Sequence, residues 1–124
     1  MSELIYKEES YEIVGICMEV HNELGPGLLE IIYKDAIEWE ADSRFVPYER
    51  EKEFSVYYKK QLLRRKFNAD FIVYDKIILE VKAKENISNE EIAQTINYLK
   101  LSGCKLGLLI NFGRSKLEVK RLVY

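Results

Sequence analysis

Residues 63–74 and 77–84 form two strand-like segments, close enough in the chain to pair as a β-hairpin, and their pattern limits the folds open to this chain. Side chains alternate between the two faces of a strand, so every second residue shares a face. One face of this hairpin is wholly apolar, with Ala69, Phe71, Val73, Ile77, Leu79, Val81 and Ala83. We expect helices to cover that face, because it cannot remain exposed to water.

Apolar spacing predicts three helices and three further strands around the hairpin. Steps of three and four residues predict helices over residues 9–24, 28–43 and 88–101. We expect the second helix to bury an apolar side made of Leu28, Ile31, Ile32, Ala36, Ile37 and Trp39. Alternation and a short apolar run predict strands over residues 54–58, 106–112 and 117–123.

The predicted order is ααβββαββ, which places the chain in the α/β class. The strand at 77–84, the helix at 88–101 and the strand at 106–112 form a right-handed crossover with parallel strands. The other connections are antiparallel, so we expect a mixed sheet with flanking helices. With 124 residues, the chain has the ordinary size of one domain, and we assign residues 1–124 to it.

Charge is distributed unevenly along the chain. Residues 1–58 hold 14 acids and 5 bases, whereas residues 59–124 hold 7 acids and 14 bases, giving −9 and +7. The asymmetry is typical of a basic face that meets phosphate, or of acids and bases placed for solubility. A basic run lies across one predicted turn and is either an exposed turn or an arm that contacts phosphate. It comprises Lys59, Lys60, Arg64, Arg65 and Lys66.

Composition excludes several classes of protein. Cys17 and Cys104 have neither CxxC spacing nor a neighbouring histidine, so we expect two reduced thiols rather than a zinc site or a disulfide. No apolar run has the length of a membrane span, and the amino terminus lacks the pattern of a signal peptide. We therefore expect a cytoplasmic protein with no membrane partner.

The second face of the hairpin carries acids. If Asp75 is the centre of the turn, Asp70 lies directly opposite Glu80, and their like charges repel. A divalent cation between them, Mg²⁺ or Mn²⁺, would relieve that repulsion. Lys82 shares this face and could stabilise charge on a phosphate. The alternative is an exposed face with scattered charges.

These residues resemble a known family. Asp70 followed by Glu80-Val81-Lys82 resembles the core motif of the PD-(D/E)XK nuclease superfamily. Residues 27–33 resemble the GxxExxY motif that names a family of small bacterial and archaeal proteins in that superfamily, and residues 20–27 and 107–113 look like the same family. The resemblance runs from about residue 5 to the end. It implies a restriction-endonuclease-like core, and Gln94 with Tyr98 resembles an element of its RecB-like branch.

The resemblance implies a role for each matching position. Asp70 and Glu80 would be metal ligands, with the carbonyl of Val81 as a third, and Lys82 would be the catalytic lysine. Glu30, on the second helix, corresponds to the helical acid that many members place near the metal.

Four further residues are assigned supporting roles. Glu30 and Tyr33 share one helix face, as do Gln94 and Tyr98, so the two helices could close a polar pocket over the hairpin. Each of Tyr33, Gln94 and Tyr98 has packing as its alternative role. His21 is either a hydrogen-bonded core histidine or part of the pocket rim. Lys84 is either solvated or in contact with phosphate.

The sequence therefore predicts a Mg²⁺- or Mn²⁺-dependent nuclease that hydrolyses DNA rather than RNA with little base specificity. A homodimer is expected, because cutting both strands of a duplex needs two sites or repeated nicking. Two alternatives remain open. One is an inactive nuclease-fold module that binds nucleic acid or regulates, and the other is a protein-interaction domain.

Overall fold

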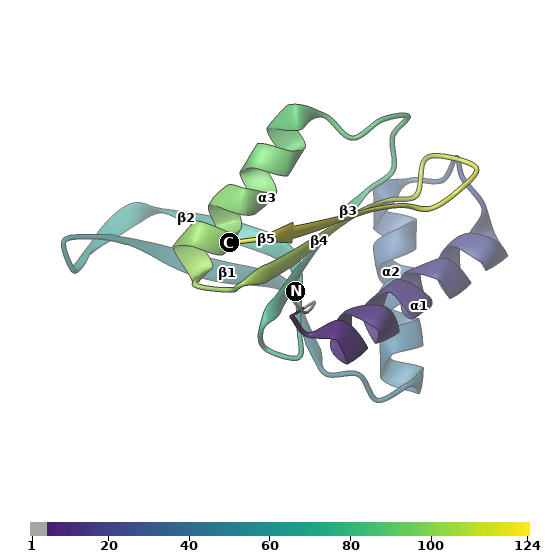
Figure 1. Ribbon diagram of the computed structural model, residues 1–124, viewed down its shortest axis with the longest axis horizontal. Coiled ribbons are helices and arrows are strands. Elements are labelled where there is room, and N and C mark those ends of the chain that lie inside the picture. The colour runs from purple at the N-terminus through teal and green to yellow at the C-terminus, as the bar shows by residue number, and fades with distance from the viewer. Residues whose placement is uncertain (1–4) are drawn as a thin grey trace, which may run out of the picture.

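The structure is a computed structural model, and it describes residues 5–124 (Figure 1). Its order of elements, ααβββαββ, is the predicted one. The elements are α1 (Lys7–Leu24), α2 (Glu30–Ser43), β1 (Tyr48–Tyr58), β2 (Gln61–Val73), β3 (Ile77–Lys82), α3 (Asn89–Ser102), β4 (Leu106–Asn111) and β5 (Glu118–Val123).

The five strands form one mixed sheet in the order β1-β2-β3-β4-β5. Strands β3 and β4 are parallel and are connected through α3, while every other neighbouring pair is antiparallel. The predicted crossover and the predicted hairpin register are both confirmed, since Ile72 pairs with Ile78 and Phe71 with Leu79.

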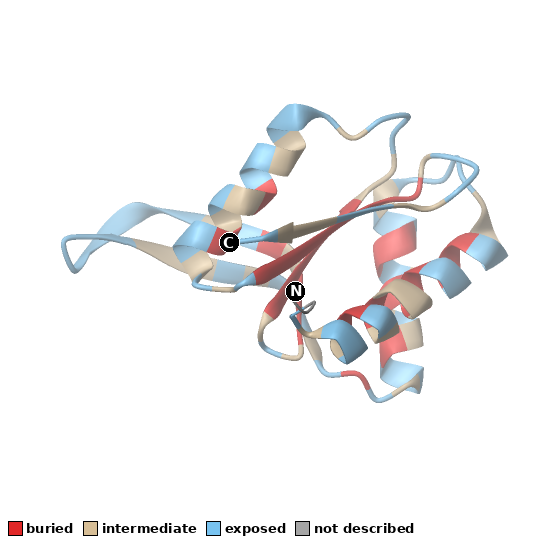
Figure 2. Ribbon diagram, viewed as in Figure 1, coloured by how far each residue is buried: buried red, intermediate tan, exposed pale blue. Residues whose placement is uncertain are grey.

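Helices cover both faces of the sheet (Figure 1). The larger core lies between the sheet and the pair α1 and α2, and a smaller one lies under α3, where Leu99 contacts Ile78. Figure 2 shows the buried residues as a band through β3 and β4. The prediction that helices cover the apolar hairpin face is right for Phe71, Val73, Ile77, Leu79 and Val81.

Ala69 departs from that prediction, because it packs with Ile78 and Leu99 in the core under α3. The reason lies in the neighbouring strand. Glu51 of β1 lies between Arg50 and Lys52, which pair with Phe71 and Ala69, and it has a positive φ of 55°. A left-handed residue interrupts the regular alternation of a strand. The break therefore falls at the position of Asp70.

The prediction for the buried side of α2 is wrong in part. Leu28, Ile31, Ile32 and Trp39 are exposed. The buried residues are Tyr33, Lys34, Ile37 and Ala41, of which three follow one another at steps of four. The buried side of α2 is less apolar than the one expected, because it includes Lys34 and the Tyr33 hydroxyl. Both groups have polar partners in the fold, Asp70 for Lys34 and the Gly25 carbonyl for Tyr33.

Strands β1 and β2 extend well beyond the rest of the sheet (Figure 1). We call the outer part, residues 57–66, the arm. It ends in a turn at Lys59-Lys60 between the paired residues Tyr58 and Gln61. Among the described residues, no helix is long and apolar enough to cross a membrane.

Candidate active site

Asp70 and Glu80 lie together where β2 and β3 separate. The backbone N–H of Asp70 donates to Glu80 Oε2 at 2.8 Å, and that of Val81 donates to Asp70 Oδ2 at 2.8 Å. Each carboxylate thus takes a backbone donor from the other strand, in place of the ladder hydrogen bonds that end at Phe71 and Leu79. The structure brings together the two acids that the sequence predicts.

Glu80 is almost fully buried, with 5% of its surface exposed. Burial, and after it the neighbouring charge of Asp70, raises the pKa of its carboxyl to about 8. The hydrogen bond from the Asp70 N–H and the ammonium groups of Lys82 and Lys34 act in the opposite direction. The ionised pair is therefore costly unless positive charge comes close to it.

Lys34 of α2 supplies such a charge, and sequence reasoning missed it. Its Nζ lies 2.9 Å from Asp70 Oδ1, 2.9 Å from Glu51 Oε1 and 4.0 Å from Glu30 Oε2. Burial alone would lower the pKa of Lys34, but the hydrogen bonds with Glu51 and Asp70 outweigh it and raise the pKa. A lysine four residues after Glu30 was the available signal, because α2 turns that side toward the sheet.

Glu30 and Lys82 complete the charged cluster. The pKa of Glu30 is raised, because burial and the charge of Asp70 outweigh the nearby ammonium groups of Lys82 and Lys34. The Lys82 ammonium lies 4.0 Å from Glu91 Oε2, and Lys84 lies 3.1 Å from the same oxygen. Lys84 is therefore an ion-paired residue at the edge of the cluster.

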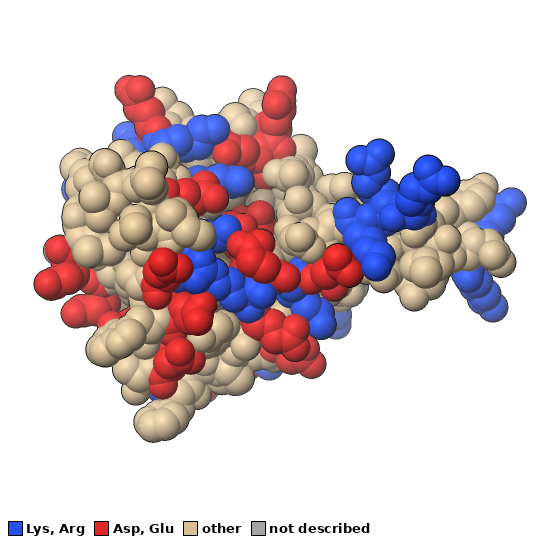
Figure 3. Space-filling view, turned by 180° about the vertical axis from the view of Figure 1, so that it is seen from behind, with Lys and Arg blue, Asp and Glu red and all other residues tan. Residues whose placement is uncertain are grey.

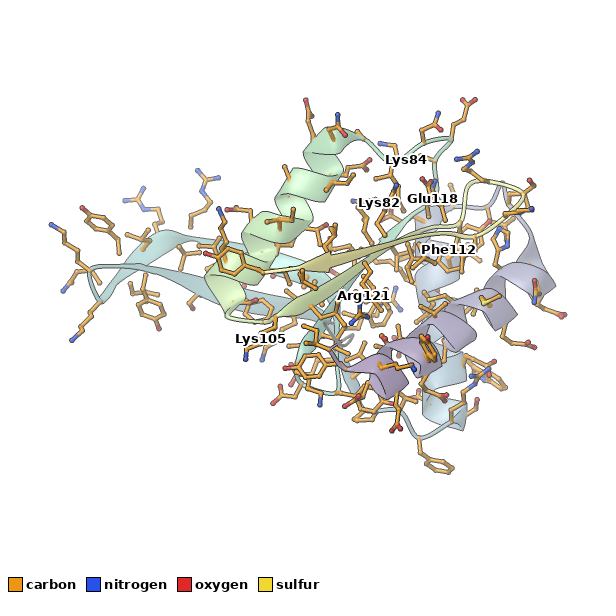
Figure 4. The ribbon with its side chains drawn as sticks, viewed as in Figure 1. Lys82, Lys84, Lys105, Phe112, Glu118 and Arg121 are labelled. Atoms are coloured by element: carbon orange, nitrogen blue, oxygen red, sulfur yellow. The ribbon has the colours of Figure 1, made fainter. Side chains whose placement is uncertain are left out.

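The end of β3 is fixed by β4. Asn111 is fully buried, accepts from the Lys84 N–H at 3.0 Å and donates to the Lys84 carbonyl at 2.8 Å. The Phe112 N–H donates to the Lys82 carbonyl at 2.8 Å. Gly113 passes so close to this segment that a Cβ there would lie 2.1 Å from the Lys84 carbonyl oxygen. Figure 4 shows Lys82, Lys84 and Phe112 at this end of the sheet.

Tyr98 of α3 faces the acids. Burial raises the pKa of its phenol, followed by the charges of Glu80 and Asp70. Its hydroxyl accepts from Gln94 Nε2 at 3.0 Å, and its ring stacks on Phe67 with 4.5 Å between centroids. The predicted pairing of Gln94 with Tyr98 is present, and Tyr98 lies at the margin of the site.

Tyr33 and His21 lie away from the acids. Tyr33 is fully buried, and its hydroxyl donates to the Gly25 carbonyl at 2.6 Å and accepts from the Leu28 N–H at 3.1 Å. It therefore holds the connection between α1 and α2, and the predicted pocket with two phenols is not formed. His21 is buried beside Phe112, with Nε2 2.8 Å from the Arg114 carbonyl oxygen. Of the two interpretations of His21, the structure favours the hydrogen-bonded core histidine.

The remaining predicted residues, Lys59, Lys60, Arg64 and Arg65, lie on the arm and are exposed. Val81 keeps its side chain in the core, and its N–H binds Asp70.

The donor set fits a hard divalent cation. Within residues 5–124, no group of three or more His, Cys, Asp or Glu side chains is arranged so that it could hold a metal ion by itself. Mg²⁺ needs no such cage, because it is commonly held by one or two carboxylates together with water and phosphate oxygens. Asp70 and Glu80 supply those two carboxylates.

Comparisons with known proteins identify the family and the fold. The chain matches the family model of the PD-(D/E)XK nuclease superfamily over residues 7–122. No curated protein matches it. A solved structure, the crystal structure of SSO0001, is similar with a TM-score of 0.61 and 19% sequence identity, over 95% of this chain and 60% of that chain. This likeness concerns the fold alone, and the chain spans about three-fifths of that protein's length. Because the family model covers nearly the whole sequence, the chain belongs to the PD-(D/E)XK nuclease superfamily.

Proposed function

We propose that this protein is a divalent-metal-dependent nuclease that hydrolyses phosphodiester bonds, with Asp70 and Glu80 as its metal ligands. The proposal rests on how these two carboxylates lie at the end of β3. Glu80 accepts from the Asp70 N–H, and Asp70 accepts from the Val81 N–H. Such a costly arrangement is expected where a cation is to be bound. Superfamily membership supports the same activity.

Each charged side chain of the site has its own role in the proposed reaction. Asp70 and Glu80, with the Val81 carbonyl as a further oxygen donor, would hold Mg²⁺ or Mn²⁺. The bound ion would supply a nucleophilic water and neutralise phosphate charge. Lys82 stabilises negative charge that develops on the phosphate. Glu30, whose pKa is raised, accepts a hydrogen bond from water near the reacting phosphate.

The proposal extends to the domain, the family, the substrate and the oligomeric state. We assign residues 1–124 to one nuclease-like domain of the GxxExxY family in the RecB-like branch. Its substrate is DNA rather than RNA, and the enzyme cuts DNA with little base specificity. Its location is the cytoplasm. A homodimer is supported by a groove of about 320 Å³ between α1 and α2, which is lined by Val20, Leu24, Ala36 and Trp39 and rimmed by three glutamates, Glu19, Glu23 and Glu40.

One observation favours a second candidate, a nuclease-fold module that binds nucleic acid without cutting it. The Lys34 ammonium already bridges Asp70 and Glu51. If it were never displaced, it would neutralise the site without a metal. Binding would then be independent of divalent ions.

A cleavage assay separates the two candidates. Purified protein is incubated with single-stranded DNA, duplex DNA, branched DNA and RNA, each with Mg²⁺, Mn²⁺ or chelator. The nuclease proposal predicts cutting with metal only, and its loss in Asp70→Asn. An exposed matched variant, Asp75→Asn, should cut as the wild type does. Binding without cutting on every substrate would favour the second candidate.

A further inference from the structure

The arm concentrates positive charge. Between Glu53 and Asp70 the sequence contains five bases and no acid. Every residue of the arm, 57–66, is exposed. Among the described ion pairs, the only one made by an arm residue joins Lys66 to Glu53 at 3.3 Å. Figure 3 shows the arm projecting from the body with Lys and Arg side chains over its length. The charge is therefore available to a partner.

The turn at the tip keeps two lysines in an unfavourable backbone conformation. Lys59 and Lys60 have φ values of 48° and 65°, the pattern of a type I′ hairpin turn. Asn-Gly is the preferred pair in such a turn, because other side chains are strained at positive φ. Two adjacent lysines at this position indicate that charge at the tip matters more than the stability of the turn.

Exposed rings and apolar side chains accompany the charge. Tyr57, Tyr58 and Leu62 expose 64%, 61% and 59% of their surface, with Lys59 over the ring of Tyr58. Cations interleaved with aromatic rings are typical of surfaces that follow a phosphate backbone and stack on bases. An acidic polypeptide would satisfy the cations but would leave the rings without a matching surface.

The arm also leads to the acids. It continues β2, the strand that carries Asp70, and Lys66 lies only four residues before it. At the rise of a strand, that separation is about 13 Å. A polynucleotide held along the arm would therefore reach the Asp70–Glu80 pair within a few nucleotides.

We propose that the arm binds nucleic acid, with Lys59, Lys60, Arg64 and Arg65 on the sugar–phosphate backbone, and guides the strand to Asp70 and Glu80. The guiding rests on the proposed function. Binding by the arm does not, because it requires neither metal nor turnover.

The experiment measures binding in chelator, so that cutting cannot interfere. Fluorescently labelled single-stranded and duplex DNA are titrated by anisotropy between 50 and 200 mM salt. The test variant, Lys59→Asn with Lys60→Gly, removes two charges and relieves the turn at once. We expect affinity to fall about tenfold at low salt and the salt slope to fall by roughly 1.5, because each lost phosphate contact removes about 0.7–0.9. Its Tm should rise, whereas a folding defect would lower it.

A matched variant distinguishes the effect of removing charge from the arm from the effect of lowering the net charge of the protein. Lys7→Gln with Lys120→Gln removes two exposed lysines, one at the start of α1 and one on β5, the edge strand opposite β1. It should bind nearly as the wild type does. The proposal is overturned if the arm variant keeps wild-type affinity, if both double variants lose affinity equally, or if the wild type ignores DNA but binds polyglutamate. Arm-dependent binding without metal-dependent cutting would instead contradict the proposed nuclease activity and leave binding by the arm supported.

Discussion

Acidic groups outnumber ammonium groups around Asp70. Four carboxylates lie within this cluster, together with two ammonium groups from Lys34 and Lys82. The acids are Glu30, Glu51, Asp70 and Glu80. If all six groups are ionised, the net charge is −2, which one divalent cation would neutralise. Electrostatics alone thus favours taking up a metal ion near Glu80, the most deeply buried of the four acids.

Replacing Glu80 tests how much the buried carboxylate lowers the free energy of unfolding. The pKa of Glu80 is about 8 in the fold, above its ordinary value of 4.5. Between those values the folded state holds a proton that the unfolded state releases, so stability falls as pH rises through this window. Glu80→Gln keeps an oxygen for the Asp70 N–H but has no charge. In chelator we expect it to match the wild type near pH 4 and to exceed it by about 2 kcal/mol at pH 8.

Urea unfolding at a series of pH values measures this difference. A Glu80→Gln protein no more stable than the wild type at pH 8 would show that the buried carboxylate is already compensated.

Lys34 should compete with a metal for Asp70. Lys34→Met removes the ammonium that shares Asp70 Oδ1 but keeps an unbranched side chain of similar length. We expect Mn²⁺ to bind about tenfold more tightly, and stability in chelator to fall by about 2 kcal/mol because Asp70 loses its partner. Titration calorimetry and thermal unfolding with and without Mn²⁺ measure both. Lys84→Met, at the exposed edge, is the control, and weaker Mn²⁺ binding by Lys34→Met would contradict the competition.

Among the helices and strands, the contact between the end of β3 and the β4–β5 connection positions Lys82. Gly113→Ala should disrupt it, since the added Cβ would meet the Lys84 backbone at 2.1 Å and backbone cannot easily move. We expect a loss of about 3 kcal/mol in unfolding free energy. Gly15→Ala is the matched control, because the nearest atom would lie 3.5 Å away and alanine favours the helix. Equal stability of the two variants would refute this account of the contact.

The hairpin was predictable because two simple signals agree on it. A short turn sets the register, and an apolar face sets its orientation, so Asp70 and Glu80 had to lie together. The crossover through α3 followed from the chain order and the handedness of such connections. These features depend on residues that are near one another in sequence.

Other parts of the site depend on contacts between distant elements, which periodicity does not reveal. The buried side of α2 includes Lys34 only because Asp70 and Glu51 are there to receive it. The positive φ of Glu51 left no sign in the sequence, because glutamate does not favour that conformation. Tyr33 shares its helix with Glu30 but turns into the core, where Gly25 and Leu28 satisfy its hydroxyl.

For the molecule as a whole, the groove between α1 and α2 is the surface that we propose for the dimer. Trp39 is 70% exposed and lines the groove between α1 and α2. If this side forms the proposed dimer, Trp39→Lys should shift the protein to monomer while leaving its Tm nearly unchanged. Sedimentation velocity over a concentration series tests this, with Phe45→Lys as the control, at an exposed residue that does not line the groove. A wild type that stays monomeric at every concentration would rule the dimer out.

In the proposed nuclease, Lys82 serves catalysis beside Asp70 and Glu80. The deciding measurement is the cleavage rate of DNA in saturating Mn²⁺ for the wild type and Lys82→Ala, with Mn²⁺ binding measured on the same samples. We expect Lys82→Ala to bind Mn²⁺ as the wild type does and to cut DNA at least about a hundredfold more slowly. A variant that binds Mn²⁺ and cuts as fast as the wild type, or a folded wild type that binds Mn²⁺ and cuts nothing, would contradict this expectation.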